Sequence, residues 1–231
     1  MDPEPAIPPR PWAPKTPAPR RRAAPNLDRE QVVAAALGMV DRDGLDEFSV
    51  RRLATQLGVT PMALYWHVAD RSELLELVGH AVLAEVVLPP RDGNWRVQLR
   101  DVHRALLVAV LRHPNTADLL VGRARYGPHG IALFETILEI LLEAGFTPET
   151  AFDAYQSLYL FTLGFTATAS RSPAFVEVQR QGLGYLLSLP TDRFGAIRAV
   201  APHIGRRSLD EQMELGLDIV IEGIAARLPR P

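Results

Sequence analysis

Residues 57–68 read LGVTPMALYWHV, and this short stretch decides the fold. Thr60 and the proline after it form a strong helix start, because the hydroxyl caps free backbone N–H groups and proline suits the first helical position. At about 100° per residue, a helix from Thr60 turns Met62 and Trp66 almost directly away from Leu64. If Leu64 faces the core, a methionine and a tryptophan face outward, and that placement indicates a binding surface.

Two helices are expected before this stretch. Asp28 with Gln31 resembles a capping box, and it opens a helix that Gly44 ends. Ser49 caps the next helix, which ends at Gly58. Three helices, the last two joined by a tight turn, fit the helix-turn-helix arrangement.

Helical periodicity continues through the rest of the chain, without strand-like alternation or a hairpin signal. Further helical segments are expected at 70–87, 95–112, 115–121, 128–144, 148–170, 175–188, 192–200 and from Ser208 onward. We therefore predict an all-α fold with an N-terminal three-helix helix-turn-helix domain and a larger helical domain for ligand binding and dimerisation.

The chain is expected to divide into an arm and two domains. The helix-turn-helix domain with its connecting helix is expected at 27–87, and the larger domain at 95–228, with the turn-rich linker LPPRDGN at 88–94 between them. Residues 1–26 are rich in proline and carry three consecutive arginines, so we expect a disordered arm that buries no core. This arm is either a solvated tail or a segment that reaches DNA phosphates.

Composition narrows the class of protein. The chain has 231 residues, of which 47% are hydrophobic and 23% charged, as in ordinary globular proteins. The absence of cysteine excludes disulfides, thiol catalysis and cysteine zinc sites. A net charge of −2 requires any nucleic-acid footprint to be local. No apolar run approaches the roughly 20 residues of a membrane span, so we expect a cytoplasmic protein without a membrane partner.

Several stretches resemble the TetR family of bacterial repressors. FSVRRLATQLGVTPMALYWHVADRSELLE (48–76) is similar to that family's DNA-binding segment. LLEAGFTPETA (141–151), LYLFTLGFT (158–166) and LGLDIVIEGI (215–224) resemble the C-terminal domain of the branch that contains the tetracycline repressor. The resemblance covers the chain from about Leu27 to Leu228.

The resemblance implies that the helix from Thr60 enters the DNA major groove. The implied DNA contacts are Pro61, Met62, Ala63 and Tyr65 near base edges, Tyr65, Trp66 and His67 at phosphates, Arg71 at the backbone, and Arg51 at a base. Arginine is the best bidentate reader of guanine, so Arg51 should carry most of the hydrogen-bonded specificity, whereas Arg52 is expected to be an ordinary surface charge. Tyr65 and Trp66 could instead be core aromatics, but neighbours on a helix cannot both be deeply buried on one side.

The last helix suits dimerisation. Its predicted dimer residues are Met213, Gly216, Leu217, Val220, Gly223 and Ile224. Gly216 and Gly223 lie seven residues apart and leave a stripe for close helix approach, and Leu215 and Ile219 add a second apolar face. The alternative is that this helix packs only inside its own chain. By resemblance, it forms a four-helix bundle with the helix at 148–170 and their copies.

The resemblance also implies a ligand cavity. The residues that map to it are Val102, Leu106, Leu120, Arg123, Phe134, Ile137, Leu138, Phe152, Tyr155 and Tyr159, each of which could equally be plain core. The tetracycline repressor holds its magnesium–drug complex with a histidine, a glutamate and an asparagine, and the matching positions here are Leu120, Thr168 and Val102. We therefore predict no metal, no cofactor and a larger, more apolar ligand. Arg123, Tyr155 or Gln156 would anchor it.

These features predict a ligand-responsive, DNA-binding transcriptional regulator. It would act as a homodimeric repressor that a small, largely apolar effector releases from a palindromic operator with half-sites about 34–36 Å apart. A co-repressor-dependent regulator, an activator and a helical ligand-binding protein without DNA binding remain alternatives. An enzyme is a further alternative, but the sequence has no H-E-x-x-H, G-x-S-x-G or phosphate-loop motif.

Overall fold

Every regular element that the structure describes is a helix. The structure is a computed structural model that describes residues 27–91, 93–171 and 175–228. The all-α prediction is confirmed. The predicted arm at 1–26 lies outside the described residues.

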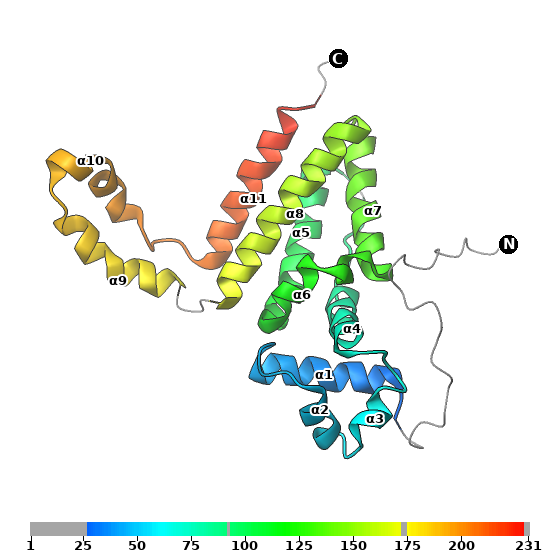
Figure 1. Cartoon of the computed structure of the whole chain (residues 1–231). Coiled ribbons are helices and arrows are strands. Elements are labelled where there is room, and N and C mark those ends of the chain that lie inside the picture. Colours follow the sequence, from blue (N-terminus) through cyan, green and yellow to red (C-terminus); the bar gives the residue numbers. More distant parts are fainter. Residues whose placement is uncertain (1–26, 92, 172–174, 229–231) are drawn as a thin grey trace.

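The N-terminal part forms a small head from which one helix rises toward the rest of the chain (Figure 1). Its elements are α1 (Arg29–Asp43), α2 (Val50–Gln56), α3 (Pro61–Leu64) and the connecting helix α4 (Arg71–Ala84). Asp28 and Gln31 form the predicted capping box, and the Ser49 hydroxyl accepts a hydrogen bond from the N–H of Arg52. Gly58 turns the chain between α2 and α3 with φ +68°, a conformation that favours glycine.

The helix after Thr60 ends before Trp66, which the sequence analysis placed on it. The α-helix α3 covers one turn, Pro61–Leu64, and the chain continues through tighter turns at 65–67. There the N–H groups of Trp66 and His67 reach carbonyls only three residues back. Val68 nevertheless donates to the Leu64 carbonyl at 3.2 Å, so both side chains still face the core of the head.

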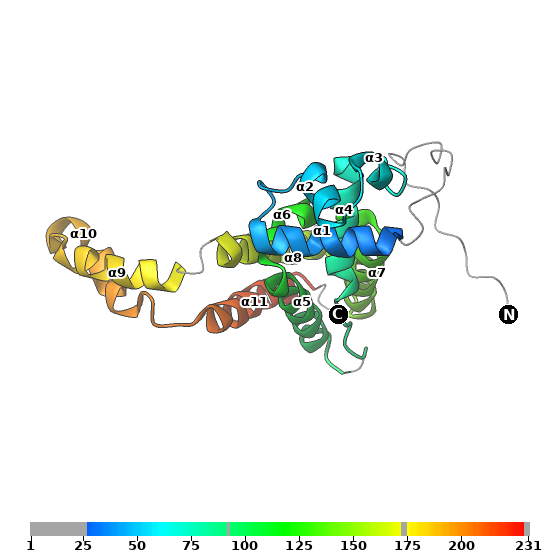
Figure 2. The ribbon, with the colours of Figure 1, turned by 90° about the horizontal axis from the view of Figure 1, so that it is seen from below.

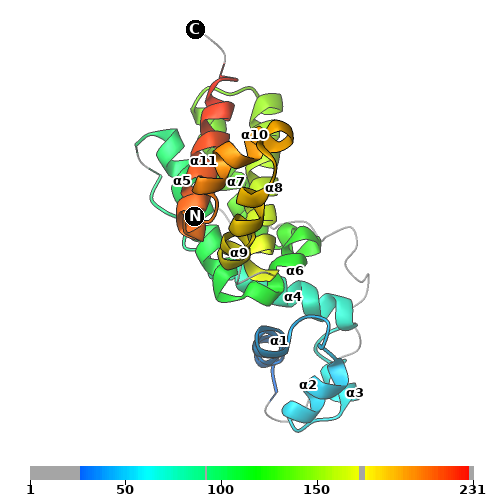
Figure 3. The same ribbon diagram turned by 90° about the vertical axis from the view of Figure 1, so that its left-hand side faces the viewer.

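The head has its own apolar core, and α4 completes it. The buried residues of this core are Val32, Ala36, Met39, Val40, Phe48, Val50, Leu53, Ala54, Leu64, Val68, Leu74, Leu75 and Val78. An ion pair between Arg29 of α1 and Glu73 of α4 adds to this contact. Figure 3 shows the head below α4, apart from the upper bundle.

The remaining helices form the body. They are α5 (Trp95–Arg112), α6 (Ala117–Val121), α7 (Pro128–Glu143), α8 (Pro148–Arg171), α9 (Phe175–Ser188), α10 (Thr191–Val200) and α11 (Leu209–Ala225), with short 3₁₀ turns η1 (Pro114–Thr116), η2 (Arg123–Tyr126) and η3 (Ala201–His203). Helices α5, α7, α8 and α11 pack side by side as a bundle (Figure 1). The predicted connecting helix at 70–87 is three residues shorter at its end, because Glu85 caps α4.

Ion pairs line the seam between α5 and α11. Arg96 pairs with Glu222 at 3.1 Å, Arg104 pairs with Glu214 at 2.6 Å, and Arg100 pairs with Asp218 between them. Each pair is partly exposed, so each contributes little stability and mainly fixes the register of the two helices.

Helices α9 and α10 project from the bundle as a second arm, distinct from the predicted arm at 1–26 (Figures 1 and 2). Val178 and Tyr185 of α9 and Val200 of α10 are exposed on this arm. No helix among the described residues is both long and apolar enough to cross a membrane.

Candidate DNA-binding surface and ligand cavity

The head presents large apolar side chains to solvent. Met62 is 65% exposed, Trp66 is 42% exposed and Tyr65 is 39% exposed, whereas Leu64 is fully buried. The predicted outward placement of Met62 and Trp66 is confirmed. This patch lies on α3, the second helix of the helix-turn-helix, and on the turns directly after it, where a recognition helix would meet a groove.

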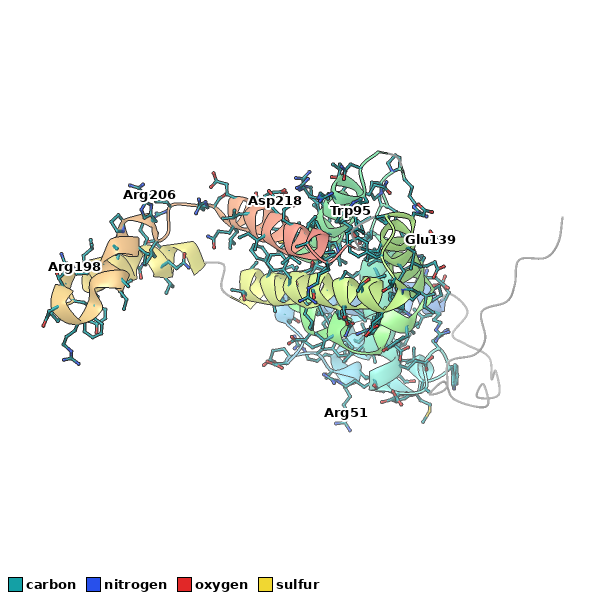
Figure 4. All side chains as sticks on the ribbon, turned by 90° about the horizontal axis from the view of Figure 1, so that it is seen from above. Arg51, Trp95, Glu139, Arg198, Arg206 and Asp218 are labelled. Atoms are coloured by element: carbon teal, nitrogen blue, oxygen red, sulfur yellow. The ribbon has the colours of Figure 1, made fainter. Side chains whose placement is uncertain are left out.

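Two adjacent arginines of α2 have different surroundings. Arg52 pairs with Asp43 at 2.6 Å and donates to the Glu47 carbonyl at 2.7 Å, so it is an ordinary surface charge as expected. The Arg51 side chain is exposed and has no ion-pair partner among the described residues. It points outward at the edge of the head (Figure 4). Arg51 is therefore free to engage a partner, and Arg52 is not.

The other implied DNA contacts differ in how exposed they are. Pro61 is exposed, whereas Ala63 is only 7% exposed, so its methyl group offers little surface to a base. His67 is partly buried, and its Nε2 has no hydrogen-bond partner among the described residues. Arg71 is exposed at the start of α4, with its guanidinium 5.6 Å from the centroid of the Phe48 ring.

The body contains an apolar cavity between α4, α5, α6, η2, α7 and α8. Its walls are Leu83, His103, Leu106, Leu120, Arg125, Gly130, Leu133, Phe134, Ile137, Tyr155, Tyr159 and Leu163. The open space between these walls is about 30 Å³. This is room for one or two water molecules, so a drug-sized ligand would have to widen the cavity.

Three aromatic rings and one guanidinium form part of the otherwise mainly aliphatic cavity wall. Phe134 lies 4.3 Å from Tyr155, which stacks on Tyr159 at 5.7 Å between ring centroids. The Arg125 guanidinium lies 4.7 Å from the centroid of Tyr159, and the Tyr159 hydroxyl donates to the Leu120 carbonyl at 2.8 Å. Burial raises the pKa of both tyrosines, although nearby Arg125 opposes this, so both phenols stay protonated.

His103 is the cavity's buried polar side chain. It is 1% exposed, and its Nδ1 shares a 2.9 Å hydrogen bond with the Thr162 hydroxyl. Its Nε2 has no hydrogen-bond partner among the described residues. Burial lowers the pKa of His103 to about 4, so the ring is neutral near pH 7.

The predicted ligand residues have different positions in the structure. Those that line the cavity are Leu106, Leu120, Phe134, Ile137, Tyr155 and Tyr159. Val102 and Leu138 belong to the bundle core instead, and Phe152 is 47% exposed on α8. The side chain of Arg123 lies outside the described residues, and the arginine at the cavity is Arg125.

Sequence reasoning missed His103 and Arg125. His103 is one helical turn before Leu106 and four residues after Leu99, so its place on the inner face of α5 could have been read from periodicity. Arg125 lies in a 3₁₀ turn, where no periodic signal was available.

Two contacts join the cavity region to the connecting helix and the head. At Gly79 of α4, an added Cβ would lie 2.6 Å from the Cβ of Ala124, so η2 approaches this helix too closely for any side chain. At the end of α5, His113 bonds Asp41 of α1 at 2.8 Å and Glu85 beyond α4 at 3.0 Å. Burial lowers the pKa of His113, but the hydrogen bonds to these carboxylates outweigh it and the pKa is raised.

The predicted dimer residues divide between two faces of α11. Met213, Leu217 and Ile224 are 0–6% exposed inside the body's own core, and a side chain at Gly216 would meet the Phe161 ring. Met213, Leu217 and Ile224 belong to internal packing, which corrects their assignment to a dimer surface, whereas Gly216 is partly exposed. Val220 is partly buried against the same core, and Gly223 is exposed with open space beside it.

The outer face of the bundle carries a different apolar set. Ile219 and Leu215 of α11 are 65% and 42% exposed, and Leu160 of α8 is 63% exposed. Gly164 of α8 and Gly223 of α11 are also exposed. We call Leu160, Gly164, Leu215, Ile219 and Gly223 the outer bundle face. Helices could approach this face closely, because two of its positions lack side chains.

A helix-turn-helix head joined by one helix to a helical body with an apolar cavity defines a class of protein, the ligand-responsive DNA-binding regulators. A family model described as tetracyclin repressor-like, C-terminal domain matches residues 89–228. The chain belongs to the TetR family of transcriptional regulators. This confirms the family that the sequence resemblance indicated.

The chain is also similar to individual transcriptional regulators, in sequence and in structure. An HTH-type transcriptional regulator of Saccharopolyspora erythraea is 32% identical over 155 residues, which cover 67% of this chain and 66% of that protein. The class A tetracycline repressor from transposon 1721 of Escherichia coli is 29% identical over 204 residues, which cover 87% of this chain and 92% of that repressor. The ligand-free crystal structure of ActR from Streptomyces coelicolor is 35% identical, with a TM-score of 0.80 and coverage of 89% of this chain and 98% of ActR. ActR has also been solved with actinorhodin.

Proposed function

We propose that this chain is a transcriptional repressor that binds a palindromic DNA duplex as a homodimer and is released by a small, largely apolar effector. The observation that carries the proposal is the exposed surface of the head. Arg51 is unpaired there, and Met62, Tyr65 and Trp66 are exposed beside it. An apolar patch of this kind costs solubility and is typical of a surface that meets a partner.

Each exposed side chain suits a different part of a duplex. Arg51 can donate two hydrogen bonds to guanine, and Met62 can contact a thymine methyl group. Tyr65 and Trp66 can donate to phosphate oxygens, which fixes the register of the head but carries no sequence information. One head reads few base pairs, so specificity requires a second head about 34–36 Å away.

The outer bundle face supports the homodimer. Its exposed leucines and isoleucine would be buried against a second copy, in an interface continuous along α8 and α11. The projecting arm of α9 and α10 adds exposed apolar residues to the surface available for a partner copy. Burial of such residues contributes about 25 cal/mol for each Å² of apolar surface.

The tight cavity supports a ligand-driven change of shape. Actinorhodin bound to ActR and minocycline bound to a TetR variant from Acinetobacter baumannii are both bulky molecules. A molecule of comparable size would have to push the cavity walls apart, and one of these walls is η2. Because η2 touches α4 at Gly79, its displacement would tilt the connecting helix and the head.

A ligand shifts this balance only as far as its affinities for the two shapes differ. Reversing a 99:1 preference requires a difference of about 5.5 kcal/mol. The effector must therefore gain this energy from contacts that exist only in the widened cavity.

Selection of binding sites from a random duplex library by the ligand-free full chain tests the proposal. We expect a palindrome with half-sites about one helical turn apart. Arg51→Ala should lower affinity for that palindrome about 5- to 150-fold and relax one base position, which corresponds to 1–3 kcal/mol. Arg52→Ala is the matched control, and its effect should stay within about twofold because that side chain is occupied elsewhere.

The same experiment tests two of the alternative functions. Enrichment that requires an added ligand would indicate a co-repressor-dependent regulator. No enrichment in any condition, with the dimer intact, would contradict DNA binding and leave a ligand-binding protein.

A further inference from the structure

The cavity has an unbalanced charge. Among the described residues of its walls, Arg125 is the only one with a permanent charge, and none is an aspartate or glutamate. Its guanidinium lies over Tyr159 and 4.9 Å from the centroid of Tyr126, and it has no carboxylate partner among the described residues. A partly buried guanidinium that contacts Tyr126 and Tyr159 but no carboxylate among the described residues still has N–H donors to offer to an anion.

The cavity also offers an unused hydrogen-bonding atom. Thr162, which occupies Nδ1 of His103, is not a cavity residue, whereas the His103 ring is part of the wall. The opposite nitrogen, Nε2, is buried and has no hydrogen-bond partner in the part of the chain that the structure describes. An unsatisfied polar atom in an apolar site costs free energy, which a ligand with a matching hydroxyl would recover.

The remaining wall is aromatic and aliphatic. Phe134, Tyr155 and Tyr159 form a continuous set of ring contacts that suits a flat ring system. A cationic ligand would be repelled by Arg125, and a purely apolar one would desolvate this guanidinium without compensation. An anionic group on an aromatic ligand avoids both costs.

Resting on the proposed ligand response, we infer that the effector is an aromatic acid. Its anionic group pairs with Arg125, its ring system lies among Phe134, Tyr155 and Tyr159, and a hydroxyl on the ring bonds Nε2 of His103. The neutral state of His103 near pH 7 fits a hydroxyl partner and leaves Arg125 as the anion's counter-charge.

Two isosteric probes test the charge. Calorimetric titration of the full-length chain with 2-naphthoate and with 2-naphthamide compares an anion with a neutral molecule of the same shape. We expect the naphthoate to bind at least about tenfold more tightly, as one charge-assisted bidentate pair allows. Arg125→Met keeps the aliphatic stem and should abolish this preference. Arg42→Met removes an equal charge from the surface of the head, at a side chain that is 56% exposed, and should preserve the preference.

A third probe tests the histidine. 6-Hydroxy-2-naphthoate should bind about five- to tenfold more tightly than 2-naphthoate to the wild-type chain. His103→Phe should remove the gain from the hydroxyl, and His103→Gln, which restores a polar group, should recover part of it. Circular dichroism of each variant verifies that the fold is retained.

The outcomes separate this inference from the proposed function. A wild-type chain that binds naphthoate and naphthamide equally, or an Arg125→Met variant that keeps the preference, would overturn the aromatic-acid inference. Failure of both probes to bind would overturn it as well, since the cavity would then not be a site for such rings. If the wild-type chain fails these probe tests but still selects a duplex, the proposed DNA-binding function stands. If the wild-type chain selects no duplex, that function is contradicted independently of the probe results.

Discussion

The contact between α4 and η2 at Gly79 makes a quantitative prediction. An added Cβ at this position would lie 2.6 Å from the Cβ of Ala124, whereas carbon atoms in ordinary contact are 3.5–4.0 Å apart. Gly79→Ala must therefore separate the two elements by about 1 Å. Overpacking of this kind costs about 1–3 kcal/mol, and replacing a helical glycine by alanine returns about 1 kcal/mol.

Gly38 of α1 provides the matched control. It is also inside a helix, but it is exposed and an added Cβ would meet no atom within 4 Å. Gly38→Ala should therefore stabilise the chain by about 0.5–1 kcal/mol through helix propensity alone. Since both variants share this gain, the difference between them isolates the cost of overpacking, which should be about 1–3 kcal/mol.

Urea unfolding followed by circular dichroism, at one fixed protein concentration, measures this difference. The concentration must be fixed because the proposed dimerisation would add to apparent stability. Stabilisation of Gly79→Ala as large as that of Gly38→Ala would refute the close approach of α4 and η2. Gly79→Ala should also weaken the binding of the selected duplex, because the connecting helix is displaced.

Three further outcomes are expected. The stabilisation of the folded chain by protonated His113 should be complete below the ordinary pKa of 6.5 and lost as pH rises through the raised folded-state pKa. The urea midpoint of the wild-type chain should therefore fall more between pH 6 and 9 than that of His113→Asn. Light scattering should show that Leu160→Asp dissociates the dimer, whereas Val97→Asp, at a position 46% exposed on α5, should leave it intact. Calorimetry should show no tight, magnesium-dependent binding of tetracycline, and such binding would contradict the prediction from Leu120, Thr168 and Val102.

Local signals explain the success of the sequence prediction in the head. The caps at Asp28 and Ser49 act within one helical turn, so they are visible in a short stretch of sequence. The phase of Leu64 relative to Met62 and Trp66 is fixed by the geometry of a single turn. The true length of α3 was not accessible, because the tighter turns at 65–67 depend on how the head packs around them.

The free face of α11, which we propose as part of a dimer surface, could be identified only from the tertiary structure. Helix α11 is apolar on two faces, so its sequence does not show which face packs inside the chain. In the structure, Met213 and Leu217 are buried against α5 and α8, and Ile219 remains exposed.

By itself, the sequence determined an all-α chain, the start and end of most helices, and the outward placement of Met62 and Trp66, because these follow from contacts between residues a few positions apart. Only the tertiary structure decided that Arg125 and His103 face the cavity and which side of α11 stays free. Those choices arise from elements distant in sequence, and no local periodicity encodes them.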